Sequence, residues 1–195
     1  MKVNFVKTFI PAKDFVAVEK VGNKMLVRFD AVKDADMDAY SCVEGSVSAS
    51  EYNEQEVRRE YEAWKQKWAE KSLALSKKAK IAEITAYDTS DKVNGFILNG
   101  LLVWLDKATR VGLMNSTTIA KSAGQKTTTL WLGSMKLVVD CDKAIQLLSA
   151  LEMYALDCFN VTASHKQAVS KLTTIEEVEA YDYKAGYPKM LKMSI

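Results

Sequence analysis

The sequence has few of the residues on which many active sites and metal sites depend. It contains one histidine and three cysteines among 195 residues. The cysteines, Cys42, Cys141 and Cys158, are widely spaced and form no Cys-x-x-Cys pair, which argues against a disulfide framework and against a zinc site. We therefore expect three reduced thiols, at least two of them buried, because free cysteine packs as a small apolar residue.

Motifs for nucleotide binding and hydrolysis are also missing. The eight glycines are scattered, and neither GxxxxGK[ST] nor GxGxxG occurs, so no phosphate-binding loop is expected. The single histidine, His165, has no cysteine or aspartate at a spacing that would place a partner on the same helical face, and we interpret it as a structural or surface residue. Acidic pairs such as Asp140 and Asp142 lie at expected helix starts, where they favour the helix dipole. We expect no metal or other cofactor.

Long apolar runs and an excess of one charge are absent as well. No run approaches the roughly 18 apolar residues that a membrane span needs, and the N-terminus lacks the apolar core and cleavage site of a secretion signal. The 27 basic and 25 acidic residues are spread evenly along the chain. We therefore expect no membrane and no nucleic acid among the partners.

One pattern is present twice, at an offset of 34 residues, in 98–106 (LNGLLVWLD) and 132–140 (LGSMKLVVD). Each copy predicts a strand, a two-residue turn, a second strand and an aspartate that caps a helix. Asn99-Gly100 suits a type I′ hairpin turn, and Gly133-Ser134 suits a type II′ turn. Helices are expected to begin near 107 and 141. We predict that the two hairpins pair into one four-stranded sheet with both helices on one face.

The N-terminal part predicts a second, smaller unit. Residues 3–29 alternate apolar and polar side chains in short runs around a hairpin turn at Gly22-Asn23, which is typical of a small β unit. Residues 30–53 show little periodicity and are interpreted as a loop or linker. A capping box at 53–56 and the apolar spacing that follows it predict a helix over 54–82.

The last third of the chain is expected to be mostly helical. The helix from near 141 is predicted to end at Asn160, with Thr162 capping a short separate helix, and Thr174 opens a further capping box before a turn-rich tail. The predicted fold class is α+β. We expect an N-terminal β unit over 1–50, a linking helix over 51–82, and a C-terminal α+β domain over 83–195 made of two β-hairpin–helix repeats.

Aromatic residues are the candidate interaction residues. Tyr61, Trp64 and Trp68 lie on one stripe of the predicted helix, where they either pack on the chain's own core or form a seam for self-association. Trp104 and Trp131 fall on strands that would be neighbours in the predicted sheet. These two are either core residues or an exposed platform for a sugar or a partner protein.

Several segments of the C-terminal half occur together, and in this order, in one family. They are ITAYDTS (84–90), NGF (94–96), WLDKATR (104–110), TTLW (128–131), ALEMYA (150–155), VTASHK (161–166) and YDYKAGYP (181–188). Over about residues 83–191 the chain resembles an uncharacterised C-terminal domain of bacteriophage and prophage proteins, often associated with tails or tail fibres. That family has no established catalytic residues, so the resemblance assigns none here.

The resemblance implies a non-enzymatic bacteriophage structural or assembly protein, associated with the tail or tail fibre. The implied partners are other phage tail proteins or a second copy of the chain in a homo-oligomer, and the implied location is the virion, or the host bacterial cytoplasm during assembly. A receptor- or carbohydrate-binding module of a phage fibre is the alternative, and it would use Trp104 and Trp131. A small enzyme acting through a cysteine or His165 is a third hypothesis, which no assembled site supports.

Overall fold

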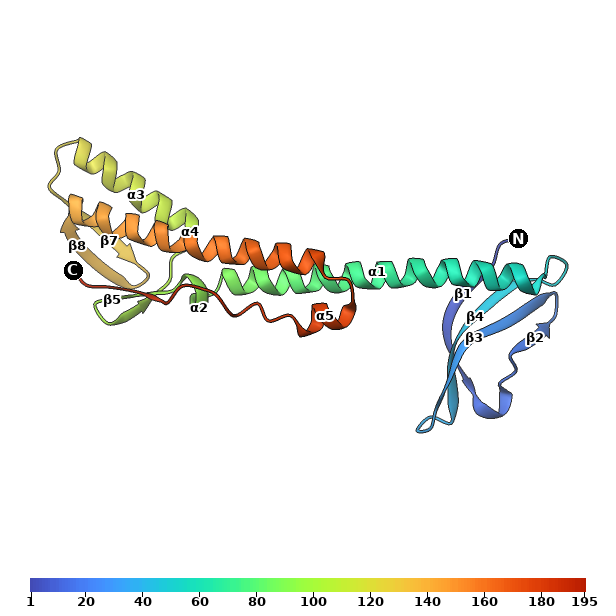
Figure 1. The fold of residues 1–195 in the computed structure, drawn as a ribbon. Coiled ribbons are helices and arrows are strands. Elements are labelled where there is room, and N and C mark those ends of the chain that lie inside the picture. Colours follow the sequence, from blue (N-terminus) through green and yellow to red (C-terminus); the bar gives the residue numbers. More distant parts are fainter. The chain divides into compact units, whose positions relative to one another are not determined.

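A computed structural model describes all 195 residues and has the predicted α+β architecture (Figure 1). The chain forms two compact units, Met1–Ser72 and Leu73–Ile195. The boundary lies within the long helix α1 (Glu54–Asp88), so each unit includes part of this helix. The boundary falls inside the expected linking segment 51–82.

The first unit contains a four-stranded antiparallel sheet in the order β1-β4-β3-β2. Its elements are β1 (Asn4–Pro11), the 3-10 turn η1 (Ala12–Asp14), β2 (Val18–Val21), β3 (Lys24–Asp34) and β4 (Ala39–Ser48). Gly22 has a φ of 60° in the turn between β2 and β3, as a tight hairpin turn requires. The predicted β unit and its first hairpin are confirmed.

The predicted loop over 30–53 is wrong, because β4 is one of the two central strands of this sheet. Its buried positions include Val43, Gly45 and Val47, which alternate with less buried polar residues. Gly45 leaves room for the Phe5 ring, since a Cβ atom at this position would lie 2.7 Å from it and force a shift. Serine and glycine conceal this alternation in the sequence, because neither is typical of a strand.

Helix α1 begins as predicted and ends later than predicted. The Asn53 side chain accepts hydrogen bonds from the backbone N–H groups of Gln55 and Glu56, at 3.0 and 3.2 Å. The helix continues past residue 82 because Ile84 is fully buried in the second unit, in a cluster with Val169 and Val178. Tertiary packing thus extends a helix whose end has no sequence signal.

The second unit contains both predicted β-hairpin–helix repeats. Its elements are α2 (Asp91–Asn94), β5 (Phe96–Leu98), β6 (Leu101–Val103), α3 (Lys107–Ser122), β7 (Thr127–Leu132), β8 (Met135–Asp140), α4 (Cys141–Lys171), α5 (Ile175–Ala180) and β9 (Leu191–Met193). Asn99 and Gly100 have φ angles of 50° and 84°, as a type I′ turn requires. Asp106 caps α3 and Asp140 caps α4, as predicted.

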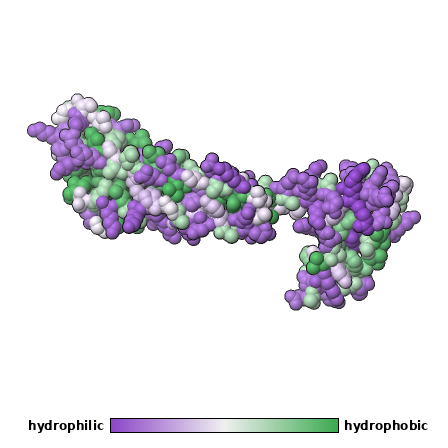
Figure 2. Space-filling model, viewed as in Figure 1, coloured by the Kyte–Doolittle hydropathy of each residue, from purple (hydrophilic) through white to green (hydrophobic).

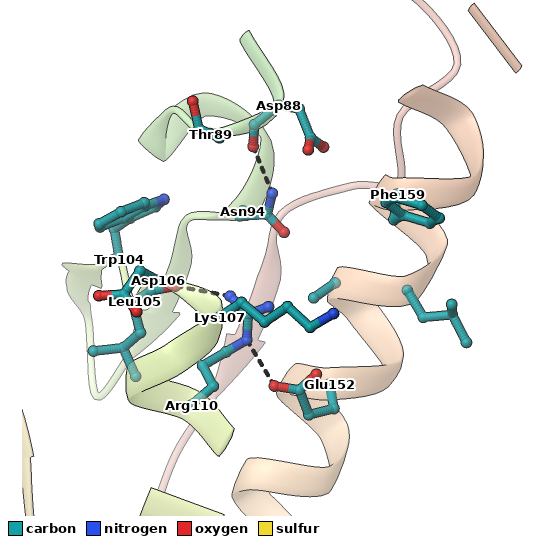
Figure 3. A pocket seen from close by; sticks show the side chains of 12 residues that line it. Asp88, Thr89, Asn94, Trp104, Leu105, Asp106, Lys107, Arg110, Glu152 and Phe159 are labelled. Carbon is teal, nitrogen blue, oxygen red and sulfur yellow. Dashed lines mark hydrogen bonds and ion pairs between the residues drawn. The ribbon is translucent and has the colours of Figure 1, made fainter. Parts of the chain in front are cut away.

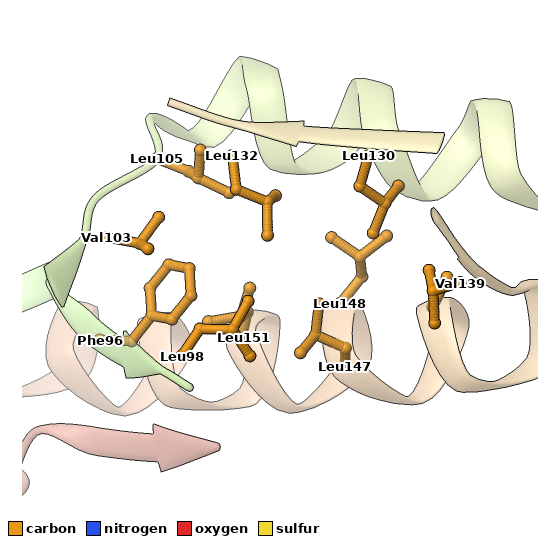
Figure 4. Close-up of a cluster of buried hydrophobic side chains, with 11 residues drawn as sticks. Phe96, Leu98, Val103, Leu105, Leu130, Leu132, Val139, Leu147, Leu148 and Leu151 are labelled. Atoms are coloured by element: carbon orange, nitrogen blue, oxygen red, sulfur yellow. The ribbon is translucent and has the colours of Figure 1, made fainter. Parts of the chain in front are cut away.

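The predicted four-stranded sheet is wrong, because the two hairpins do not pair with each other. Strand β5 lies between β6 and the parallel strand β9, while β7 and β8 form a separate two-stranded ribbon. Both hairpins instead contribute to one apolar core, in which Leu130 and Leu132 of β7 point toward Leu148 and Leu151 of α4 (Figure 4). Burial against α4 therefore stabilises a ribbon that would be marginal alone.

Helix α4 is continuous, so the predicted end at Asn160 and the predicted cap at Thr162 are wrong. The Thr162 side chain is buried and bonds to other elements. Its hydroxyl donates to Asp88 Oδ1 at 2.7 Å and lies 2.8 Å from the Tyr187 hydroxyl. Asparagine inside a helix costs only a few tenths of a kcal/mol, which this packing offsets. The predicted capping box at Thr174 is confirmed at the start of α5.

Candidate functional site

The main pocket lies in the second unit, where the end of α1, the segment from β6 to α3, and α4 meet (Figure 3). Its volume is about 400 Å³. We call it the α4 pocket. The lining residues that matter below are Asp88, Trp104, Asp106, Lys107, Arg110, Glu152, Leu156 and Phe159.

Arg110 is the one buried cation of this pocket, with 8% of its surface exposed. Its Nε donates to Glu152 Oε1 at 2.8 Å, and its Nη1 donates to the Leu105 carbonyl oxygen at 2.7 Å. These bonds fix the plane of the guanidinium group between α3 and α4. The remaining group, Nη2, makes no hydrogen bond within the protein and is available to a ligand in the pocket.

The three carboxylates of the α4 pocket already have donors. Asp106 accepts from the Thr109 backbone N–H at 2.8 Å, and this bond, with that from the Thr109 hydroxyl, lowers the pKa of Asp106. Asp88 accepts from Thr162, and Glu152 is paired with Arg110. By contrast, Lys107 makes no ion pair or side-chain hydrogen bond. Lys107 and the Nη2 group of Arg110 are therefore the cationic donors that remain available in the pocket.

Three large apolar side chains surround the opening, and we call them the apolar rim: Trp104, Leu156 and Phe159. They are 40%, 48% and 59% exposed, respectively. Trp104 and Phe159 lie on opposite sides of the pocket, and the Lys107 side chain extends from α3 toward α4 between them (Figure 3). In the space-filling view, apolar side chains reach the surface among polar ones along the helical part of this unit (Figure 2).

The predicted aromatic stripe of α1 faces the sheet of its own unit. Tyr61 is buried, stacks on Phe29 with ring centroids 4.1 Å apart, and donates its hydroxyl to Asp30 Oδ2 at 2.7 Å. Burial and this bond raise the pKa of Tyr61. Trp64 is half-buried and stacks on Trp68, which is 43% exposed. Tyr61 is therefore a core residue, and only the Trp68 end of the stripe reaches the surface.

The structure does not bring Trp104 and Trp131 together on neighbouring strands. Trp104 follows β6 and belongs to the α4 pocket, whereas Trp131 lies on β7 of the separate ribbon. Trp131 is 57% exposed, and the ammonium group of Lys136 lies 5.9 Å from its ring centroid. The predicted strand adjacency is wrong because the hairpins do not pair.

His165 and the cysteines have structural surroundings. His165 Nδ1 lies 2.8 Å from the Tyr181 hydroxyl, and Nε2 lies 2.9 Å from the Ala185 carbonyl oxygen, so both ring nitrogens hold the C-terminal segment. All three cysteines are free and buried, as expected. No group of three or more histidine, cysteine, aspartate or glutamate side chains is placed to hold a metal ion, and no helix is both long and apolar enough to span a membrane.

Sequence reasoning missed Arg110, Glu152, Leu156 and Phe159 as a group. Glu152, Leu156 and Phe159 follow one another on α4 at spacings of four and three, which places them on one helical face. That face lies beside the buried apolar stripe, so the sequence does not distinguish it from core. Arg110 belongs to the WLDKATR segment, but its pairing with α4 depends on how α3 packs.

Comparison with known proteins gives one match. The family model described as "Domain of unknown function (DUF4376)" matches residues 76–185. No curated protein and no solved structure matches the chain. The matched range includes the whole α4 pocket and excludes the sheet of the first unit. Because the match covers more than half of its length, the chain belongs to the DUF4376 family.

Proposed function

We propose that this chain is a non-enzymatic bacteriophage structural or assembly protein, associated with the tail or tail fibre, that works by holding protein partners. The observation that carries the proposal is the apolar rim around the α4 pocket. Trp104, Leu156 and Phe159 are large, exposed and gathered at one opening. Apolar surface gathered in this way marks protein contacts, and aromatic side chains often contribute most of the binding energy there.

The phage context rests on the resemblance of the C-terminal segments. Most of these segments, from ITAYDTS to VTASHK, fall within the range matched by the family model. A partner-binding surface suits a tail or assembly protein because such proteins act through contacts with other subunits. We place the chain in the virion, or in the host bacterial cytoplasm during assembly.

Self-association is a second contact that we propose, through the exposed end of the α1 stripe. Trp68 stacks on Trp64, and the Lys7 ammonium group lies over the Trp68 ring, 5.0 Å from its centroid. Symmetric oligomers are common among soluble proteins, and an exposed tryptophan supplies apolar contact area. Trp68→Glu should convert an oligomer into a folded monomer in light scattering. A wild-type chain that is already monomeric at micromolar concentration would contradict this contact.

The experiment is disruption of the coding sequence in the phage or prophage that carries it. We expect particles with missing or incomplete tails in negative-stain electron microscopy, and restoration when the wild-type chain is supplied in trans. Complete, infectious particles that lack the chain by mass spectrometry would overturn the proposal.

A receptor- or carbohydrate-binding role on a fibre is the second candidate, and the exposure of Trp104 in the pocket and of Trp131 on the ribbon favours it. The same experiment separates the two roles. Loss of the chain would then leave complete tails and reduce adsorption to host cells, and soluble host polysaccharide would compete with adsorption.

A further inference from the structure

We propose that the α4 pocket binds a carboxylate next to an apolar side chain in a partner polypeptide, with Arg110 and Lys107 as the carboxylate donors. The inference rests on the proposed function and deepens it, because it names the chemistry of the partner. It follows from three features of the pocket: a buried guanidinium with an unpaired edge, an unpaired lysine, and the apolar rim.

The guanidinium of Arg110 is held ready for an anion. Its bonds to Glu152 and to the Leu105 carbonyl occupy Nε and Nη1, so binding requires no reordering of the side chain. Nη2 remains, with two N–H donors and no partner in the protein. A hydrogen bond from a buried guanidinium to a carboxylate is charge-assisted and stronger than one to a neutral acceptor.

Lys107 supplies the second donor from the solvent side. Its flexible side chain extends across the pocket toward α4 (Figure 3), and it has no ion pair in the protein. The carboxylates of Asp88, Asp106 and Glu152 each accept a bond from Thr162, Thr109 or Arg110. A ligand carboxylate therefore meets the unpaired ammonium group of Lys107 and the free Nη2 edge of Arg110, whose Nε is already paired with Glu152.

The apolar residues that line the pocket indicate that the ligand also has an apolar part. A volume of about 400 Å³ is larger than a carboxylate needs, and Trp104, Leu156 and Phe159 surround the remaining space. An apolar side chain beside the acidic group would bury these walls and itself.

The test uses a matched pair of small probes on the full-length chain. N-acetyl-L-phenylalanine carries a carboxylate beside an apolar side chain, and N-acetyl-L-phenylalaninamide lacks the charge. In a titration followed by ¹⁵N-resolved NMR, the acid should shift the Trp104 indole N–H and the Arg110 Nε–H. It should bind at least about tenfold more tightly than the amide, because charge-assisted bonds from Arg110 and Lys107 are stronger than bonds to a neutral acceptor. Equal affinities, or shifts elsewhere only, would overturn the proposal.

Lys107→Gln is the informative variant, because Lys107 is exposed and holds no structural contact. It should weaken binding of the acid several-fold and leave the amide unchanged. Lys143→Gln is the matched control, since Lys143 is an exposed lysine outside the pocket with no ion pair, and it should change neither affinity. Unchanged binding of the acid to Lys107→Gln would remove Lys107 from the site.

Two further outcomes separate this inference from the proposed function. Glucuronate that shifts the pocket resonances, when the phenylalanine probe does not, would assign the carboxylate to a sugar and overturn the polypeptide partner. A pocket that binds neither probe, in a chain whose loss still blocks tail assembly, would overturn the ligand chemistry and leave the function standing. Binding of the acid by the pocket, together with normal particles in a phage that lacks the chain, would support the ligand chemistry and overturn the proposed function.

Discussion

Removing the Thr162 hydroxyl tests how the second unit is held together. A hydroxyl has one proton, and Thr162 donates it to Asp88 Oδ1 at 2.7 Å. The Tyr187 hydroxyl, 2.8 Å away, must then donate to Thr162 Oγ1. One side chain therefore joins α4 to the end of α1 and to the C-terminal segment. Thr162→Val keeps the shape of the side chain and removes both bonds.

The expected cost is about 2 kcal/mol. A hydrogen bond to a charged group contributes about 1.5–3 kcal/mol and a neutral one about 0.5–1.5 kcal/mol. Asp88 and Tyr187 are only half-buried, so water replaces part of the loss. For a unit of this size, about 2 kcal/mol lowers the melting temperature by roughly 8 °C. Urea unfolding followed by circular dichroism measures the change, and Ser164→Ala, an exposed hydroxyl on the same helix, is the control.

A double-mutant cycle with Tyr187→Phe identifies the mechanism. If the bridge exists, the combined variant should be less destabilised than the sum of the single variants, by about 1 kcal/mol. Strict additivity would show that Thr162 and Tyr187 act separately. A loss below about 0.5 kcal/mol for Thr162→Val, the range of ordinary surface substitutions, would refute the reasoning.

Five other substitutions test local features. Gly100→Val should destabilise the second unit by about 1–2 kcal/mol in urea unfolding, because a β-branched residue is strained at a φ of 84°. Gly112→Ala inside α3 should stabilise the unit by about 0.5–1 kcal/mol, because the added methyl group has open space and alanine favours a helix. Asp30→Ala should lower the free energy of unfolding by about 1–3 kcal/mol, since the Tyr61 hydroxyl of a buried residue loses its acceptor. Asp30→Asn should lower it less, because asparagine keeps an acceptor and tolerates the φ of 48°. Burial raises the pKa of Tyr154 to about 12. The stability that the protonated Tyr154 hydroxyl contributes is therefore complete below about pH 10 and is lost between pH 10 and 12. Tyr154→Phe should make the free energy of unfolding depend less on pH in this range. Equal stabilities of Gly100→Val and Gly112→Ala, equal stabilities of Asp30→Ala and Asp30→Asn, or an unchanged alkaline unfolding curve for Tyr154→Phe would contradict these assignments.

Local features of the fold could be predicted because they depend on neighbouring residues. The turn at Asn99-Gly100 and the caps at Asp106 and Asp140 follow from backbone angles and side-chain acceptors within a few residues. Long-range pairing could not be predicted in the same way. Strand β9 has only three residues, and its place beside β5 is decided by packing of a distant segment.

The α4 pocket likewise combines residues that the sequence identifies with contacts that depend on long-range packing. The sequence identifies Trp104 as an aromatic candidate, but its surroundings depend on three segments that are far apart in the sequence. Arg110 and Glu152 are 42 positions apart, and only the packing of α3 on α4 brings them within 2.8 Å. Phe159 is 59% exposed on α4, and its place in the lining of the pocket depends on the packing of the other two segments beside α4.

The most direct test of the central claim is whether the apolar rim is needed for tail assembly. Phe159→Glu places a charge on the exposed rim, and Ile119→Glu places one at an exposed apolar position of α3 outside the pocket. Each variant is supplied in trans to particles that lack the chain, after equal melting temperatures have been established. We expect Ile119→Glu to restore complete tails in electron microscopy and Phe159→Glu to fail. Complete tails in equal numbers with both variants would contradict the account.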